Sequence, residues 1–144
     1  MSSVEQFPFV NADTTLGEAG FRPYMPIQLV SQQCSITASA LLDTGATVNV
    51  LPYQAGIELG YVWEHQTATL NLTGNLAQYE ARVVVIQGVI RQFEPVQLVF
   101  AWTKSVQVPL ILGQVNFFME FDVCFYRSQL YFAVVPKKKP SKSS

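Results

Sequence analysis

The stretch that decides the fold places one carboxylate between two apolar runs: Leu41-Leu42-Asp43-Thr44-Gly45-Ala46. Residues 35–42 alternate apolar and polar side chains, and residues 48–51 are short and rich in β-branched side chains. Both patterns predict strands, so Asp43 is expected in a loop between them. An ionised carboxylate in apolar surroundings is costly unless it is paired or hydrogen-bonded. On these residues alone, an ordinary β-turn and a functional loop are both open, because Asp and Gly are common in turns.

Short strand patterns recur along the rest of the chain. Strands are predicted over residues 24–30, 67–72, 79–86, 93–102, 121–125 and 130–135, with turns at 31–33, 73–75, 87–88 and 127–129. Residues 53–60 fit either one helical turn or a loop, and one short helix is predicted over residues 114–120. Many short strands separated by turn residues predict an all-β barrel or sandwich.

The length of 144 residues suits a single domain, and 49% apolar residues can supply its core. Residues 1–20 carry several turn-forming residues and are predicted to be a flexible N-terminal arm, in which a strand over residues 7–10 is left open. The packed domain is expected to span residues 21–136. Residues 137–144, which begin with three lysines, are predicted to be a disordered basic tail.

The charge pattern and the motif content exclude several classes of function. A net charge of −1 with no basic stripe in the body of the chain argues against nucleic acid as a ligand. No apolar stretch reaches the ~18 residues that a membrane span needs, and no signal peptide is recognised. Cys34 and Cys124 are far apart, which favours a cytoplasmic protein with reduced, buried thiols. With one His and scattered acids, neither a metal site nor a cofactor is expected.

A second motif precedes the predicted helix: Leu110-Ile111-Leu112-Gly113-Gln114. The two motifs together, with the entry segment at residues 23–27, resemble the retropepsin-like aspartic proteases, which are the retroviral proteases and their single-domain bacterial and cellular relatives. The resemblance covers roughly residues 22–135. It implies a closed β-barrel of the acid protease fold, with one short helix near the C-terminus.

The same resemblance implies an aspartic endopeptidase with Asp43, Thr44 and Gly45 as catalytic residues. The chain contains a single Asp-Thr-Gly, so a symmetric homodimer is expected to place Asp43 opposite its own copy. The two carboxylates would share a proton and activate a water molecule against a protein or peptide substrate. Extended, largely apolar segments are the expected substrates. Thr44 would brace the two loops across the symmetry axis.

The family also has a flap, a hairpin that closes over the substrate. Residues 67–79 are the candidate here, with the tip at Leu72, Thr73, Gly74 and Asn75. Gly at the tip permits a sharp bend and a close approach to the substrate. With Ala46, these tip residues are the predicted substrate-binding residues. An ordinary surface hairpin is the alternative for residues 67–79.

The chain departs from the retroviral pattern at three positions. Thr47 and Val48 stand where retroviral members often carry acids, and Gln114 stands where they carry Arg. These differences place the chain nearer the cellular and bacterial members. Two other functions remain open: a non-catalytic dimerisation or peptide-binding module, and a barrel for a small apolar ligand. The intact Asp43-Thr44-Gly45 favours the protease, because a site without catalysis has no physical reason to keep a buried acid.

Overall fold

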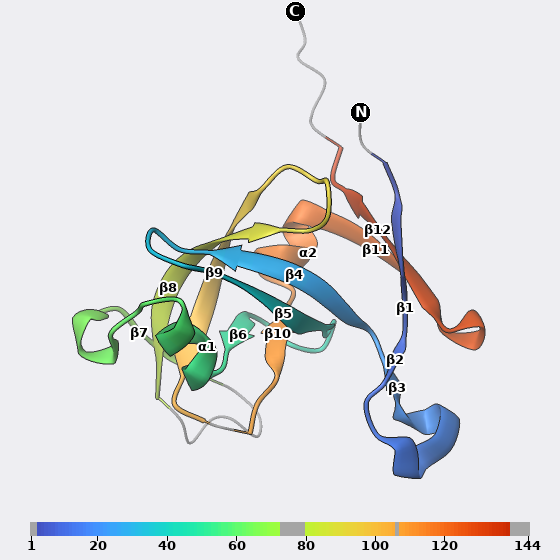
Figure 1. The fold of residues 1–144 in the computed structure, drawn as a ribbon, viewed down its shortest axis with the longest axis horizontal. Coiled ribbons are helices and arrows are strands. Elements are labelled where there is room, and N and C mark those ends of the chain that lie inside the picture. The colour runs from blue at the N-terminus through green and yellow to red at the C-terminus, as the bar shows by residue number, and fades with distance from the viewer. Residues whose placement is uncertain (1–2, 73–79, 106, 139–144) are drawn as a thin grey trace, which may run out of the picture.

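The computed structural model describes residues 3–72, 80–105 and 107–138. A ring of six strands closes into a barrel (Figure 1) in the order β4, β5, β10, β6, β9, β8, because β8 pairs with both β9 and β4. The ring consists of β4 (Tyr24–Val30), β5 (Ser35–Leu42), β10 (Leu110–Leu112), β6 (Asn49–Leu51), β9 (Val96–Thr103) and β8 (Glu80–Val89). A further strand, β7 (Thr69–Asn71), extends the sheet from β8. The all-β barrel predicted from the sequence is confirmed.

Alternation along the strands fills the barrel. On β4, Met25, Ile27 and Leu29 are buried, while Pro26 and Gln28 between them are exposed. Each such side chain contributes roughly 1.5–3 kcal/mol relative to an exposed one. Phe100, Trp102 and other side chains of the facing strands complete the same core.

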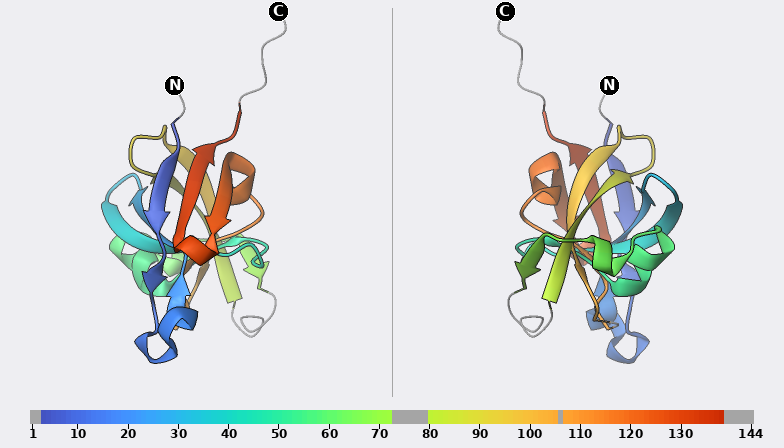
Figure 2. Two further views of the ribbon diagram at one scale, coloured as in Figure 1. Left: turned by 90° about the vertical axis from the view of Figure 1, so that its right-hand side faces the viewer. Right: turned by 90° about the vertical axis from the view of Figure 1, so that its left-hand side faces the viewer.

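A second sheet lies beside the barrel (Figures 1 and 2) and has three strands in the order β1, β12, β11. They are β1 (Glu5–Pro8), β12 (Tyr131–Pro136) and β11 (Phe121–Tyr126). Phe7 of β1 is fully buried and stacks on Phe132 of β12, with ring centroids 5.5 Å apart. Phe117, in the helix α2 (Phe117–Glu120), stacks on Phe121 with centroids 5.2 Å apart. Aromatic packing therefore joins the second sheet to the core.

The arm predicted at residues 1–20 is for the most part packed on the domain. Besides β1, residues in this range form β2 (Val10–Asn11), which pairs with β3 (Phe21–Arg22), and the 3₁₀ segment η1 (Thr14–Gly20). Asp13 caps η1, and hydrogen bonds from Thr15 hold the pKa of Asp13 below its usual range. The packed fold thus begins near Glu5 rather than at residue 21. The prediction failed because Phe7 and Phe9 are buried by β12, a strand that is far away in the sequence.

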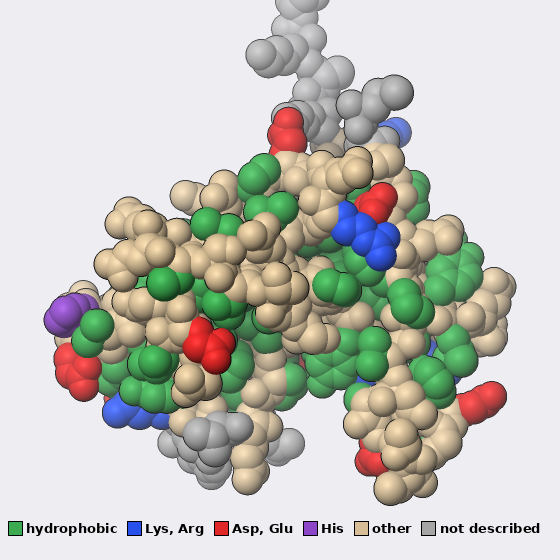
Figure 3. Space-filling model, in the orientation of Figure 1, with side chains coloured by type: hydrophobic (Ala, Val, Ile, Leu, Met, Phe, Trp, Pro, Cys, Tyr) green, Lys and Arg blue, Asp and Glu red, His purple; other side chains and the backbone are tan. Residues whose placement is uncertain are grey.

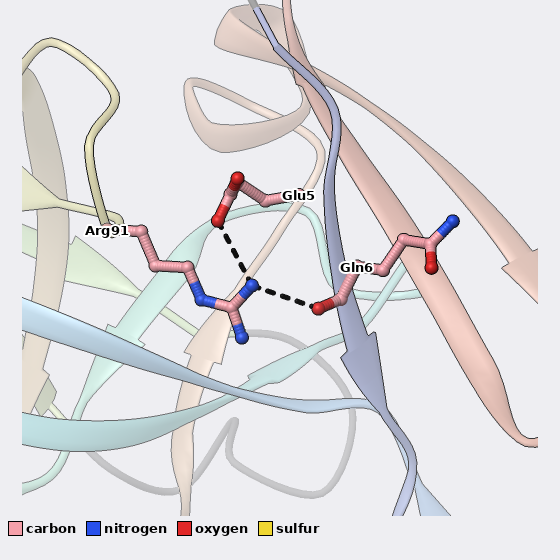
Figure 4. A network of polar contacts seen from close by, with 3 residues as sticks. All are labelled: Glu5, Gln6 and Arg91. Carbon is pink, nitrogen blue, oxygen red and sulfur yellow. Dashed lines mark hydrogen bonds and ion pairs between the residues drawn. The ribbon is translucent and has the colours of Figure 1, made fainter.

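An arginine in the β8–β9 loop clamps β1 from the barrel side (Figure 4). Arg91 Nη1 donates to Glu5 Oε1 and to the Gln6 carbonyl oxygen, both at 3.0 Å. The guanidinium carbon also lies 3.9 Å from the centroid of the Phe7 ring. The ion pair is partly exposed, so the cation–π contact and the backbone hydrogen bond are expected to matter as much as the charges.

Three local expectations need correction. The turn predicted at residues 87–88 is wrong, since both residues lie inside β8. An added Cβ on Gly88 would sit 2.5 Å from Leu98 Cδ1, so glycine is present for a packing reason. Glycine there permits close packing and does not mark a turn. The predicted helix over residues 114–120 begins only at Phe117. Cys34 and Cys124 are unpaired, as expected, but both are exposed.

The structure also contains a second short α-helix, α1 (Tyr53–Glu58), where the sequence left a helical turn or a loop open. Gly56 of α1 lies against the buried Trp102, whose Cε2 would be 2.2 Å from an added Cβ. Two 3₁₀ turns complete the described elements, η2 (Trp63–His65) and η4 (Arg127–Gln129).

The face shown in Figure 3 is mainly apolar or uncharged, with few and scattered charged side chains. Across the described part of the chain, no helix is both long and apolar enough to cross a bilayer.

Candidate active site

Asp43 lies directly after β5, where the strand order brings the two sequence motifs together. β10 lies between β5 and β6, so the loop that joins β5 to β6 must pass over the end of β10. β5 and β10 run parallel with Leu42 opposite Leu112, and the Asp43 N–H donates to the Leu112 carbonyl at 3.0 Å. The half-buried Asp43 therefore sits beside Gly113.

The loop turns back on the carboxylate of Asp43. The Gly45 N–H donates to Asp43 Oδ1 at 2.9 Å, and the Ala46 N–H donates to the Asp43 carbonyl at 3.1 Å. A Cβ on Gly45 would lie 3.3 Å from the same Oδ1, which is closer than an ordinary contact. Glycine at position 45 thus lets the backbone N–H approach the carboxylate closely.

The segment between β10 and α2 supports the loop. Its backbone donates from Gln114 to the Ala46 carbonyl at 2.9 Å and from Val115 to the Thr47 carbonyl at 2.8 Å. The Gln114 side chain adds a third bond, from Nε2 to the Thr44 carbonyl at 2.6 Å. The two motifs that carried the family resemblance are therefore in direct contact.

Two asparagines that were not predicted from the sequence support the loop and the segment after β10 through side-chain hydrogen bonds. Asn49 is fully buried; its Nδ2 donates to the Val99 carbonyl and to Asn116 Oδ1, both at 3.0 Å, and its Oδ1 accepts from the Gly113 N–H at 2.8 Å. Asn116 has a positive φ of 82° and also accepts from the Val99 N–H at 2.8 Å. One available signal was Asn49 itself, because a polar side chain within a buried strand requires partners.

A small open cavity of about 290 Å³ borders the loop. Asp43 and Thr44 line it together with Phe9, Pro23, Leu42, Phe125 and Arg127. Asp43 is the one acid among these described lining residues, so this part of the wall offers no second carboxylate. A larger cavity of about 1000 Å³ lies elsewhere, between η2 and the ends of β4 and β8, and none of the described residues that line it is an acid.

Comparison with known proteins identifies the architecture. No protein-family model matches the sequence, and no curated protein matches it significantly. Among solved structures, a retropepsin-like aspartic protease from Rickettsia conorii aligns over 94% of both chains with a TM-score of 0.60 and 12% sequence identity. The chain has a retropepsin-like fold. EIAV protease complexed with the inhibitor HBY-793 aligns over 64% of this chain and 81% of its own, with 20% identity and a TM-score of 0.43. A TM-score this low supports no statement about this chain.

Within this retropepsin-like fold, the predicted site residues fall into two groups. Asp43, Thr44, Gly45 and Ala46 form one loop, with Thr44 and Gly45 exposed and Ala46 half-buried. Leu72 is buried, in a small apolar cluster with Val50, Ala81 and Ala101. Thr73, Gly74 and Asn75, predicted for the flap tip, lie outside the described residues. The described residues contain no group of three or more His, Cys, Asp or Glu side chains that could hold a metal ion.

The buried amide of Asn49 leads to a stability prediction. Asn49→Leu keeps the approximate volume but leaves the Gly113 N–H and the Val99 carbonyl without their amide partner. The free energy of unfolding is expected to fall by ~2–3 kcal/mol, since an orphaned buried polar group costs ~1–3 kcal/mol. Urea unfolding measures this change. Asn71→Leu, at an exposed position of β7, is the control and should change stability by less than ~0.5 kcal/mol. Equal stability of both variants would contradict a supporting role for Asn49.

Proposed function

We propose that the chain is an aspartic endopeptidase whose active site is completed by two copies of Asp43, one from each subunit of a homodimer. The observation that carries this proposal is the half-buried Asp43 at an open cavity, with a backbone N–H directed at its carboxylate. The retropepsin-like fold supports it. A second copy is needed because the chain has one Asp-Thr-Gly and no other acid lines the described cavity wall.

The chemistry follows from two carboxylates placed close together. Like charges a few ångströms apart cannot both ionise easily, so the pair holds one proton. The ionised carboxylate removes a proton from a water molecule, whose oxygen attacks the peptide carbonyl carbon. The protonated carboxylate donates a hydrogen bond to the carbonyl oxygen and passes its proton to that oxygen as the new C–O bond forms, which gives a diol. The diol collapses and the C–N bond breaks: the leaving amine takes a proton from one carboxyl group, and a diol hydroxyl returns a proton to the other carboxylate. Thr44 and Gly45 hold the geometry of the loop.

The apolar residues around the loop favour an extended, largely apolar substrate. Val48 comes just after the Asp43 loop, and Ile111 lies in β10, just before the segment that supports the loop. Both side chains are half-buried against the cluster of Val50, Leu72, Ala81 and Ala101. A substrate side chain of apolar character would cover the part that remains exposed. Ala46, Leu72, Thr73, Gly74 and Asn75 are the proposed substrate-binding residues. An extended segment suits such a site because its backbone can pair with the protein as an added strand.

The proposal is tested by measuring proteolysis at different protein concentrations. The substrate is an unstructured protein with apolar segments, assayed at several pH values, and sedimentation gives the monomer and dimer fractions. Cleavage is expected to rise with about the square of concentration where monomer dominates, and linearly where dimer dominates, because the dimer alone carries the pair. Absence of cleavage throughout would favour the non-catalytic module. Linear activity of a strictly monomeric species would contradict the two-subunit mechanism.

A further inference from the structure

Gln114 contacts the same peptide group that serves Asp43. Its Nε2 donates to the Thr44 carbonyl oxygen at 2.6 Å, and the N–H of that peptide, which belongs to Gly45, donates to Asp43 Oδ1 at 2.9 Å. A continuous chain of hydrogen bonds therefore runs from the Gln114 side chain, through one peptide, to the carboxylate. In the sequence, Gln114 ends the second motif and stands where retroviral members carry Arg.

The geometry of a peptide group couples these two bonds. The group is planar, with its C=O and N–H in one rigid unit, so holding the oxygen also fixes the direction of the N–H. A donor on the carbonyl oxygen further polarises the peptide and strengthens the bond that its N–H makes. The Gln114 amide can therefore act on the Asp43 carboxylate without touching it.

We propose that Gln114 is a positioning residue, whose side-chain amide aligns and polarises the Thr44–Gly45 peptide and so orients the Asp43 carboxylate for catalysis. This inference rests on the proposed protease function. The side chain of Gln114 is a neutral donor, so it adds no charge beside a pair of carboxylates that must share one proton. A cation in its place would favour the ionised form of that pair.

The backbone bonds around Gln114 separate this role from a purely structural one. The loop is also held by the N–H groups of Gln114 and Val115, which bond to the Ala46 and Thr47 carbonyls. These bonds do not depend on the side chain. Gln114 is exposed, so replacing its side chain is expected to leave the fold intact and to change the orientation of one peptide group.

The test compares Gln114→Met, which keeps the length but removes the donor, with Val115→Ala at the neighbouring exposed position. Gln114→Met is expected to lower kcat about tenfold, as the loss of one hydrogen bond would. KM should stay within about twofold and the unfolding midpoint should stay unchanged. The amide proton resonance of Gly45 should move upfield, because its bond to Asp43 weakens. Val115→Ala should match the unaltered chain in every measurement.

The two kinds of measurement distinguish the inference from the function on which it rests. A Gly45 resonance that is unmoved in Gln114→Met would overturn the hydrogen-bond chain, whatever the activity. An active unaltered chain whose Gln114→Met variant keeps full kcat would overturn the positioning role and leave the protease intact. An inactive unaltered chain would overturn the protease, and with it the catalytic part of this inference.

Discussion

An Asp43→Asn chain is expected to fold and associate normally and to cleave peptides at least about 1000-fold more slowly, because general acid–base chemistry contributes ~10²–10⁴-fold. The amide of asparagine can neither take the proton of the attacking water nor share a proton with a second carboxylate. Its oxygen can still accept the Gly45 N–H that now reaches Asp43 Oδ1 at 2.9 Å. The loop should therefore keep its conformation while the chemistry is lost.

The measurement is the rate at which new amino termini appear in an unstructured protein substrate. Urea unfolding and sedimentation of the same variant show whether its fold and its association are unchanged. A second arm mixes the variant with the unaltered chain. If two copies of Asp43 act together, random pairing in an equimolar mixture leaves about a quarter of the dimers with both carboxylates. Cleavage by Asp43→Asn at the unaltered rate would exclude catalysis by this residue.

Gly113→Ala is expected to lower the free energy of unfolding by ~3 kcal/mol and to remove activity, because overpacking a rigid site costs ~1–3 kcal/mol and the loop would also be displaced. An added Cβ would lie 2.6 Å from the Val48 carbonyl oxygen and 2.8 Å from the Ala46 carbonyl oxygen. The Ala46 oxygen and the Gly113 backbone cannot move apart easily. The Ala46 carbonyl accepts the Gln114 N–H, and the Gly113 N–H is itself held by buried Asn49.

Gly17→Ala provides the matched control for this substitution. Gly17 has a positive φ of 58°, but an added Cβ there meets nothing within 4 Å. Its ψ of −132° is also unfavourable for alanine, so Gly17→Ala should cost ~1–3 kcal/mol of stability, with activity retained. Urea unfolding and peptide cleavage are measured for both variants. Equal loss of activity in the two would show that contact with the Asp43 loop is not the reason glycine is needed at position 113.

The loop that carries Asp43 and the barrel could be predicted because their determinants are local. Alternation along residues 24–30 and 35–42 matches β4 and β5 at both ends. The Asp-Thr-Gly loop and the Leu-Gly motif carried the resemblance to retropepsins, and the strand order brings them into contact. That Asp43 and the flap residues act as proposed stays a prediction.

Other features depend on neighbours that are distant in the sequence. The turn at residues 87–88 was predicted wrongly because Gly88 serves close packing against Leu98. The flexible arm was predicted wrongly because β12 buries Phe7. The Asn49–Asn116 pair spans 67 positions of sequence, and no local pattern joins the two residues.

The local pattern of side chains was thus enough to predict the strands of the barrel and the loop that carries Asp43, while the second carboxylate stays a prediction. Only the tertiary structure places β10 between β5 and β6, and this position brings Gly113 and Gln114 into contact with the loop. The reason is physical. Alternation and turn chemistry act over a few residues, whereas the direction of the Gly45 N–H toward Asp43 depends on a carbonyl held by a side chain about 70 residues away.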